Sequence, residues 1–266
     1  MKLHPVHGKH SVRLADADAK PPTSAKSGED LDRATRKETD RISDLQRVLY
    51  ADARYALLIV LQGRDASGKD GTIRKVFSAV NPQGCSVASF KTPTELESHH
   101  DFLWRVHQQV PARGMIGIFN RSHYEDILVP RVHELVPKKV WSTRYDQINE
   151  FERMLTENNV VILKFLLHVS RAEQKRRLEE RLTDRTKNWK FRVGDLDDRD
   201  RWDDFTKAYR GVLTHTSTKW APWYVVPADD KDVRDWLVAR AIADCMDGLD
   251  LRYPRADQSI VGIDVK

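Results

Sequence analysis

The sequence predicts a three-layer α/β domain built around a parallel, five-stranded sheet. Short apolar runs alternate with segments of helical periodicity, and each run is continuously apolar rather than alternating with polar residues. Continuous apolarity is typical of strands covered on both faces, and a β-α-β order supplies the covering helices. The chain of 266 residues is long enough to bury a sizeable core. The expected strands are residues 56–61, 85–90, 115–119, 160–169 and 223–226.

Helical segments lie before and between these strands. Residues 29–52 carry Leu31, Ile42 and other apolar residues at helical spacing in a charged background, which indicates an amphipathic helix packed on the main domain. Residues 1–28 show no apolar period and contain several prolines, so we expect an extended or partly ordered N-terminal extension. A single domain then covers residues 29–266. Its other expected helices are residues 69–80, 94–109, 144–158, 171–182, 198–213 and 232–246.

Composition and charge exclude several classes of protein. The longest apolar run, residues 55–61, is far shorter than the roughly 20 residues of a membrane span. The first residues lack the apolar region of a secretory signal. Cys85 and Cys245 are too few for a disulfide scaffold or a zinc ribbon, which favours the reducing cytoplasm. A net charge of +5 does not by itself indicate nucleic-acid binding, so we expect neither a nucleic-acid nor a membrane partner.

A phosphate-binding loop follows the first expected strand. Gly63 and Gly68, with Lys69, have the G-x-x-x-x-G-K spacing, and a helical pattern comes directly after them. The glycines allow backbone N–H groups to point inward at phosphate oxygens, while Lys69 and the positive end of the helix add charge. Asp70 replaces the usual Ser or Thr that follows the lysine.

Asp65 places a carboxylate inside this loop. It would repel a bound phosphate chain unless a cation lay between them, so it is a candidate Mg²⁺ ligand. The alternative is that Asp65 only stabilises the loop through an Asx-turn.

A second polar cluster follows the third expected strand. Ligands of parallel α/β sheets bind outside the carboxyl ends of the strands, so Arg121 is well placed to hold a phosphoryl group with two hydrogen bonds. Glu125 and Asp126 could reach a metal ion or the acceptor. The alternative interpretation is a solvated loop with ordinary surface charges.

Residues 171–210 are unusually charged, with 13 Lys or Arg and 10 Asp or Glu. A charged insertion after the fourth strand is where a mobile lid is expected in an α/β nucleotide enzyme. Arg177 and Arg181 lie four residues apart and would share a helix face suited to a chain of phosphates. The arginines could equally be solvated and paired with the glutamates of the same segment.

Four motifs together resemble the polyphosphate kinase 2 family. They are the loop at 63–71, Asn-Pro-Gln-Gly at 81–84 with Ser-Phe-Lys-Thr-Pro-Thr at 89–94, Asn-Arg-Ser-His-Tyr-Glu-Asp at 120–126 continuing to 132, and Asn-Trp-Lys-Phe at 188–191 with Asp-Leu at 195–196. The resemblance covers about residues 45–230. It implies a P-loop kinase fold similar to thymidylate kinase, with a helical lid over residues 171–210. It also implies Mg²⁺-dependent phosphoryl transfer between inorganic polyphosphate and nucleotides, with Mn²⁺ as a possible substitute, in a homo-oligomer (dimer or tetramer).

The resemblance also implies residue roles. The expected catalytic residues are Asp65, Lys69, Arg121, Glu125 and Asp126. Polyphosphate is expected to contact Gly63, Ala66, Ser67, Gly68, Lys69, Asp70, Arg121, Arg176, Arg177 and Arg181. The nucleotide is expected to contact Asn81, Gly84, Lys91, Pro93, Thr94 and Glu125. The metal ion is expected on Asp65 and Asp195.

The motif at 120–126 indicates a branch of the family. Many members have Asp where this chain has Asn120, and Asn-Arg where it has Glu125-Asp126. The Tyr-Glu-Asp form resembles the branch, class III, that phosphorylates AMP to ADP and ADP to ATP, reversibly.

Two other functions stay open from the residues: an ATP-dependent nucleoside or nucleotide kinase of the same fold, and a P-loop binding module that contacts nucleic acid through residues 171–210.

Overall fold

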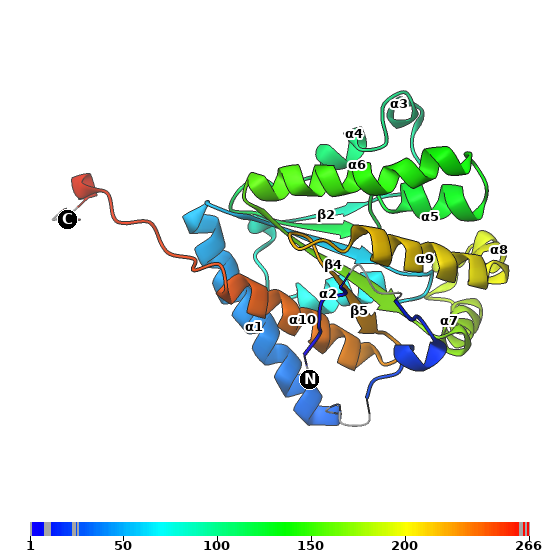
Figure 1. The fold of residues 1–266 in the computed structure, drawn as a ribbon. Helices are drawn as coiled ribbons and strands as arrows, with labels where there is room; N and C mark the ends of the chain where they lie inside the picture. The colour runs from blue at the N-terminus through cyan, green and yellow to red at the C-terminus, as the bar shows by residue number, and fades with distance from the viewer. Residues whose placement is uncertain are drawn as a thin grey trace.

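The computed structural model describes residues 2–7, 12–22, 25, 27–260, 263 and 265. Its centre is a five-stranded sheet in the order β2-β3-β1-β4-β5, with every neighbouring pair parallel (Figure 1). The predicted parallel five-stranded sheet is therefore confirmed. Its strands are β1 (Ala56–Gln62), β2 (Cys85–Ser89), β3 (Ile116–Asn120), β4 (Val160–His168) and β5 (Trp223–Pro227).

The central strand β1 shows why continuous apolarity predicts this sheet. All its residues are buried, and successive side chains point to opposite faces of the sheet. Leu57, Ile59 and Leu61 join one apolar cluster, whereas Leu58 and Val60 join the other.

Helices cover both faces of the sheet, which confirms the three-layer class. On one face lie α1 (Gly28–Asp52), α2 (Lys69–Val76) and α10 (Lys231–Asp247). On the other lie α5 (Glu125–Val132), α6 (Lys138–Glu157) and α9 (Trp202–Thr216). Within the described ranges, no helix has the length and apolarity required to cross a membrane.

Shorter helices lie at the periphery. They are α3 (Glu95–Ser98), α4 (Trp104–His107), α7 (Arg171–Thr183) and α8 (Gly194–Asp200), with the 3-10 turns η1 (Asp16–Ala19), η2 (Pro82–Gly84), η3 (Asn188–Lys190) and η4 (Gln258–Ile260).

Several predicted helix boundaries are wrong for local reasons. The single helix predicted at 94–109 is two short helices, because Asp101 accepts a hydrogen bond from the backbone N–H of Leu103 and interrupts the helical pattern. The predicted helix at 198–213 is divided between α8 and α9 at Arg201. Helix α5 was not predicted, since it is short and contains Pro130.

The charged segment 171–210 is not a single structural unit. Helices α7 and α8 with η3 lie at the edge of the domain, but α9 packs into the core through Phe205, Tyr209 and Val212. The lid boundary predicted at residue 210 therefore falls inside a core helix.

The described part of the N-terminal extension, which we expected to be extended or partly ordered, is docked on the domain. Val6 N–H donates to Trp223 O of β5 at 2.8 Å, Leu3 lies in a core cluster, and Ala19 is fully buried. Strand β5 is at the edge of the sheet, where unpaired backbone groups need cover. The segment supplies that cover.

A fully buried ion pair ties four segments together: β4, α6, the end of α9 and the segment that follows β3. Lys164 Nζ on β4 donates to Glu152 Oε2 on α6 at 2.6 Å, to the Tyr124 hydroxyl at 2.8 Å and to Thr216 O at 2.7 Å. The Tyr124 hydroxyl and His123 Nε2 lie 2.7 Å and 3.2 Å from Glu152 Oε1. The segment that follows β3 is thus fixed to α6 and β4.

Glu152→Gln is expected to lower the free energy of unfolding by about 3–5 kcal/mol, because it leaves the Lys164 ammonium buried without its counter-charge. Urea unfolding measures this. Glu150→Gln on the same helix is the control, since Glu150 pairs with Arg153 in solvent, and its effect should stay below about 1 kcal/mol. Equal losses for the two variants would contradict the importance of the buried pair.

Candidate active site

The loop between β1 and α2 is held close to its neighbours. Gly68 has φ +104°, and a Cβ there would lie 2.0 Å from Arg234 Nη1. A Cβ at Gly63 would lie 2.7 Å from Leu167 O of β4. Only glycine fits either position, which explains their spacing in the sequence.

Arg177 orients the backbone of this loop. Its side chain is 5% exposed, and it donates to Ala66 O at 3.0 Å and to Ser67 O at 3.1 Å. The same guanidinium donates to Ala228 O, Asp229 O and Glu173 Oε1. These five contacts use all five N–H groups of an arginine. The carbonyls of Ala66 and Ser67 thus turn outward to Arg177, while the Ser67 N–H donates to Arg64 O within the loop at 3.1 Å.

Arg177 therefore differs from its sequence-based expectation. With its donors engaged by the protein, it acts on the loop rather than on a phosphate chain. Its neighbour Arg176 has a side chain that is 57% exposed and bonds Glu173 and Glu180 on the lid surface. Arg181 has an intermediate side-chain exposure of 20%, and it donates to Asp195 Oδ2 at 3.1 Å.

Lys69 is buried at the start of α2. Its Nζ donates to Gly63 O at 2.7 Å and to Arg64 O at 3.2 Å. Burial, together with the nearby positive charge of Arg121, lowers the pKa of Lys69 to about 8.

Asp65 and Arg121 form the ion pair at the centre of the site, with Nη2 and Oδ1 2.5 Å apart. Arg121 has φ +63°, a left-handed conformation that costs about 1–3 kcal/mol for a residue with a side chain. Burial acts to lower the pKa of Arg121, but Glu125 and Asp65 raise it overall. The guanidinium is thus a permanent cation at the carboxyl end of β3.

Glu125 and Asp126 begin α5 but face different partners. Glu125 Oε1 lies 2.9 Å from the Gln62 amide, in the amide orientation that satisfies both groups, and burial raises its pKa. Asp126 bonds Arg105 Nη2 at 3.2 Å, and burial raises its pKa as well. Glu125 therefore faces the central charges, whereas Asp126 faces the loop after β2, because Arg105 also donates to Lys91 O.

The lid places Asp195 near the loop. Asp195 is 6% exposed, and burial followed by the charge of Asp65 raises its pKa. Lys190 Nζ also approaches Asp70 Oδ2 at 3.8 Å, and Asn120 Nδ2 donates to Asp70 Oδ1 at 2.7 Å. Residues from the first loop, the third strand and the lid are thus brought together as the motifs predicted.

The predicted nucleotide-binding residues near β2 are divided between the two ends of that strand. Lys91, Pro93 and Thr94 follow the carboxyl end of β2, on the side of the phosphate-binding loop. Asn81 and Gly84 precede β2, and a strand of five residues separates the two ends. A Cβ on Gly84 would lie 1.8 Å from the Gln46 amide of α1. This geometry corrects the expectation for Asn81 and Gly84: they pack a turn against α1.

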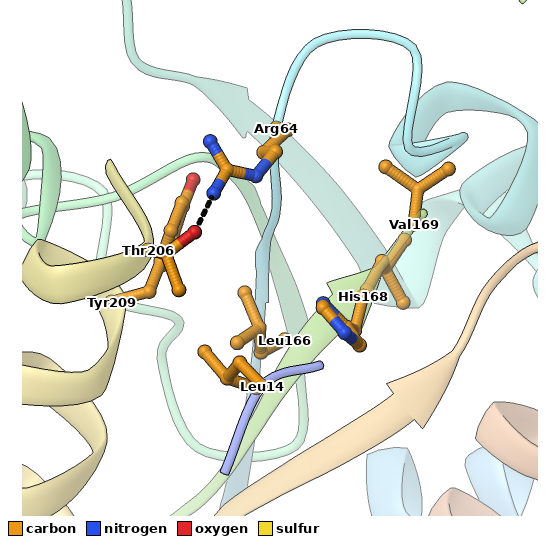
Figure 2. Close-up of a pocket in the computed structure, with 8 residues that line it drawn as sticks. Leu14, Arg64, Leu166, His168, Val169, Thr206 and Tyr209 are labelled. Carbon is orange, nitrogen blue, oxygen red and sulfur yellow. Dashed lines mark hydrogen bonds between the residues drawn. The ribbon is translucent and has the colours of Figure 1, made fainter. Parts of the chain in front are cut away.

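Three residues of the site carried no signal in the sequence. Arg64 stacks on Trp202 with its guanidinium 3.7 Å from the ring centroid. Figure 2 shows its hydrogen bond to Thr206 Oγ1, at 2.6 Å. Tyr209 points its hydroxyl toward Arg64, and burial followed by the charge of Glu125 raises its pKa. Gln174 Nε2 donates to Asp65 O at 3.1 Å. Each depends on a partner distant in the sequence.

The carboxylates of the site suit a hard cation that is shared with substrate. In the described ranges, no group of three or more His, Cys, Asp or Glu side chains could hold a metal ion by itself. Mg²⁺ commonly uses one or two carboxylates together with phosphate oxygens. Asp65 and Asp195, the two carboxylates expected to hold a metal ion, are paired with Arg121 and Arg181.

A glycine-rich loop after the central parallel strand, a buried lysine and the arginines of α7 are features of a phosphoryl-transfer enzyme of the P-loop kinase fold. The chain belongs to the polyphosphate kinase 2 family, because the family model for polyphosphate kinase 2 matches residues 25–253. The resemblance seen in the motifs is thereby confirmed.

Individual relatives agree with this family. An AMP/ADP-polyphosphate phosphotransferase of Meiothermus ruber is 54% identical over 217 residues, which is 82% of this chain and 81% of the relative. An ADP-polyphosphate phosphotransferase of Rhodopseudomonas palustris is 47% identical and covers 82% of this chain and 80% of its own. The crystal structure of polyphosphate kinase 2 from Arthrobacter aurescens TC1 superimposes with a TM-score of 0.90 at 38% identity, over 99% of this chain and 96% of that one.

Binding of inorganic tripolyphosphate to the free protein is expected to weaken as pH rises above about 8, where Lys69 loses its proton. The affinity should fall by up to about tenfold per pH unit until the pKa of Lys69 in the complex is reached. Calorimetry at pH 7 and 9 measures this. Lys69→Met corrects for ionisation of the ligand, and an equal pH dependence in that variant would refute the assignment.

Arg177→Ala is expected to destabilise the protein by about 3 kcal/mol or more, since it leaves buried carbonyls without donors. The adjacent Arg176→Ala, on the exposed face, should change the free energy of unfolding by about 0.5 kcal/mol or less. Thermal and urea unfolding of the two variants measure the difference. Similar stabilities would show that Arg177 does not hold the loop.

Proposed function

We propose that this protein transfers the terminal phosphoryl group of inorganic polyphosphate to AMP, forming ADP, and to ADP, forming ATP, in reversible reactions. The observation that carries the proposal is the central constellation of Asp65, Lys69 and Arg121 under an arginine-bearing lid. The relative from Meiothermus ruber, named for both AMP and ADP, supports the two acceptors.

The acceptor nucleotide is proposed to enter on the β2 and β3 side. Lys91, Pro93 and Thr94 lie there, beside Glu125 at the start of α5. Arg121 would hold the phosphate that is transferred, between the acceptor and the loop. Its left-handed backbone fixes the guanidinium direction before substrate arrives, which lowers the cost of orientation.

The donor chain is proposed to lie on the loop N–H groups and Lys69, with Gly63, Ala66, Ser67, Gly68 and Asp70 lining its path. From the lid, Arg176 and Arg181 would face the chain, whereas Arg177 would act by positioning the loop. The acceptor oxygen attacks the terminal phosphorus in line, and the bond to the bridging oxygen breaks. The acceptor phosphate is already ionised near pH 7, so the protein mainly positions and neutralises charge.

We propose Mg²⁺ as the metal ion, held by Asp65 and Asp195, with Mn²⁺ as a substitute. When bound, it would neutralise charge on the phosphate oxygens. Arg121 and Arg181 are the present partners of these carboxylates, and both guanidinium groups would then be released toward phosphate. Tyr209, which keeps its proton because its pKa is raised, is a further hydrogen-bond donor beside the loop. We also propose a cytoplasmic homo-oligomer.

The test incubates the protein with Mg²⁺ and AMP, together with either long-chain polyphosphate or ATP, and resolves the nucleotides by chromatography. ADP followed by ATP with polyphosphate is the expected result. Product with ATP alone would favour an ordinary nucleotide kinase. Absence of turnover with either donor, together with salt-sensitive nucleic-acid binding, would favour the binding module.

Asp65→Asn is expected to lower turnover with polyphosphate by about 10²–10³-fold, because the amide keeps the shape but loses the charge that holds the cation. Asp203→Asn, an exposed carboxylate on α9, is the control and should leave turnover unchanged. Near-normal turnover of Asp65→Asn, at normal stability, would reject the metal role of this residue.

A further inference from the structure

The described N-terminal segment 12–20, here called the strap, crosses the carboxyl ends of β4 and β5. His168 Nε2, at the end of β4, lies 2.9 Å from Ala15 O. Asp16 Oδ2 accepts from the backbone N–H of Arg171, the first residue of α7, at 3.2 Å. Asp229 N–H, just after β5, donates to Ala19 O at 3.0 Å. The strap therefore bridges the two loops that follow β4 and β5.

The strap fills space beside the phosphate-binding loop. Leu14 lines a pocket together with Arg64, His168, Val169 and Tyr209 (Figure 2). Ala19, the last residue of η1, is fully buried. Figure 1 shows η1 against the beginning of α7, at the base of the lid. The N–H of Arg171, which would otherwise be open to a ligand at a helix start, is bonded to the strap.

The strand order shows on which side of the phosphate-binding loop the strap lies. The phosphate-binding loop follows β1, with β3 and β2 on one side and β4 and β5 on the other. If the acceptor lies on the β2 and β3 side, in-line transfer requires the rest of the donor to leave away from it, toward β4 and β5. Ligands of parallel α/β sheets bind outside the carboxyl ends of the strands, and the strap crosses those ends at β4 and β5.

We propose that the strap excludes the ribose and base of a nucleoside triphosphate donor and thereby selects an unsubstituted phosphate chain; this rests on the proposed function. Polyphosphate has no group wider than a phosphate and passes beside the strap. With ATP as donor, the bond from the terminal phosphorus to its bridging oxygen would break and a bond to the AMP phosphate oxygen would form, giving two ADP. The strap hinders that reaction sterically.

Two variants of the full chain displace the strap by different routes. Ala19→Gln forces a larger side chain into a fully buried position, and Leu14→Ala with Asp16→Ala removes the pocket contact and the anchor on α7. Ala17→Gln is the matched control, because it makes the same change at an exposed position of the same turn. Labelled AMP reports ADP formation from ATP or from polyphosphate, each as kcat/KM of the donor.

In both strap variants, kcat/KM for ATP is expected to rise about tenfold or more, the size of discrimination that a filled pocket provides. The value for polyphosphate should change by less than about threefold, and Ala17→Gln should match the unmodified protein. A donor ratio unchanged in both variants, or changed equally in Ala17→Gln, would overturn the proposal.

If either variant loses activity with both donors, a binding measurement tests the proposal instead. Calorimetry then measures the affinity for the β,γ-imido analogue of ATP in the presence of AMP. Tighter binding than to the unmodified protein supports the proposal, and unchanged binding overturns it. If the unmodified protein makes no ADP from polyphosphate, the proposed function itself is rejected. If it does so while the variants keep its donor ratio, only the role of the strap is rejected.

Discussion

The guanidinium of Arg177 is the contact on which the phosphate-binding loop depends. A loop can present its N–H groups to an anion only if its carbonyls have partners elsewhere, and Arg177 supplies donors to Ala66 O and Ser67 O. The same side chain also donates to Ala228 O and Asp229 O. Arg177 therefore connects the loop, helix α7 and the segment after β5.

The charges around this loop are paired with one another. Asp65 pairs with Arg121, and Asp195 pairs with Arg181. In the proposed reaction, phosphates and a cation would take over as partners of these charges. The buried Lys164–Glu152 pair fixes the segment from which Arg121 and Glu125 project, because Lys164 also donates to the Tyr124 hydroxyl.

The sequence predicted the sheet because buried parallel strands are apolar throughout, and it predicted the loop because glycine spacing reflects backbone geometry. It failed where the role of a residue depends on a distant partner. Arg176 and Arg177 are neighbours of the same type, yet one faces solvent and the other is buried. Asn81 and Gly84 precede β2, whereas Lys91 follows it, so the strand places them at opposite ends of the sheet. The sequence motif alone did not show this separation. Arg64, Gln174 and Tyr209 carry no local pattern.

The contacts of the loop also constrain the order in which the chain can fold. Ala66 is bonded to a residue 111 positions later, and Ser67 to Arg234, 167 positions later. Contacts this far apart form late, after much of the loop-closure entropy has been lost. During synthesis the first third of the chain therefore emerges with its anion-binding loop unformed. The capacity to hold phosphate arises only when α10, near the end of the chain, docks on the sheet.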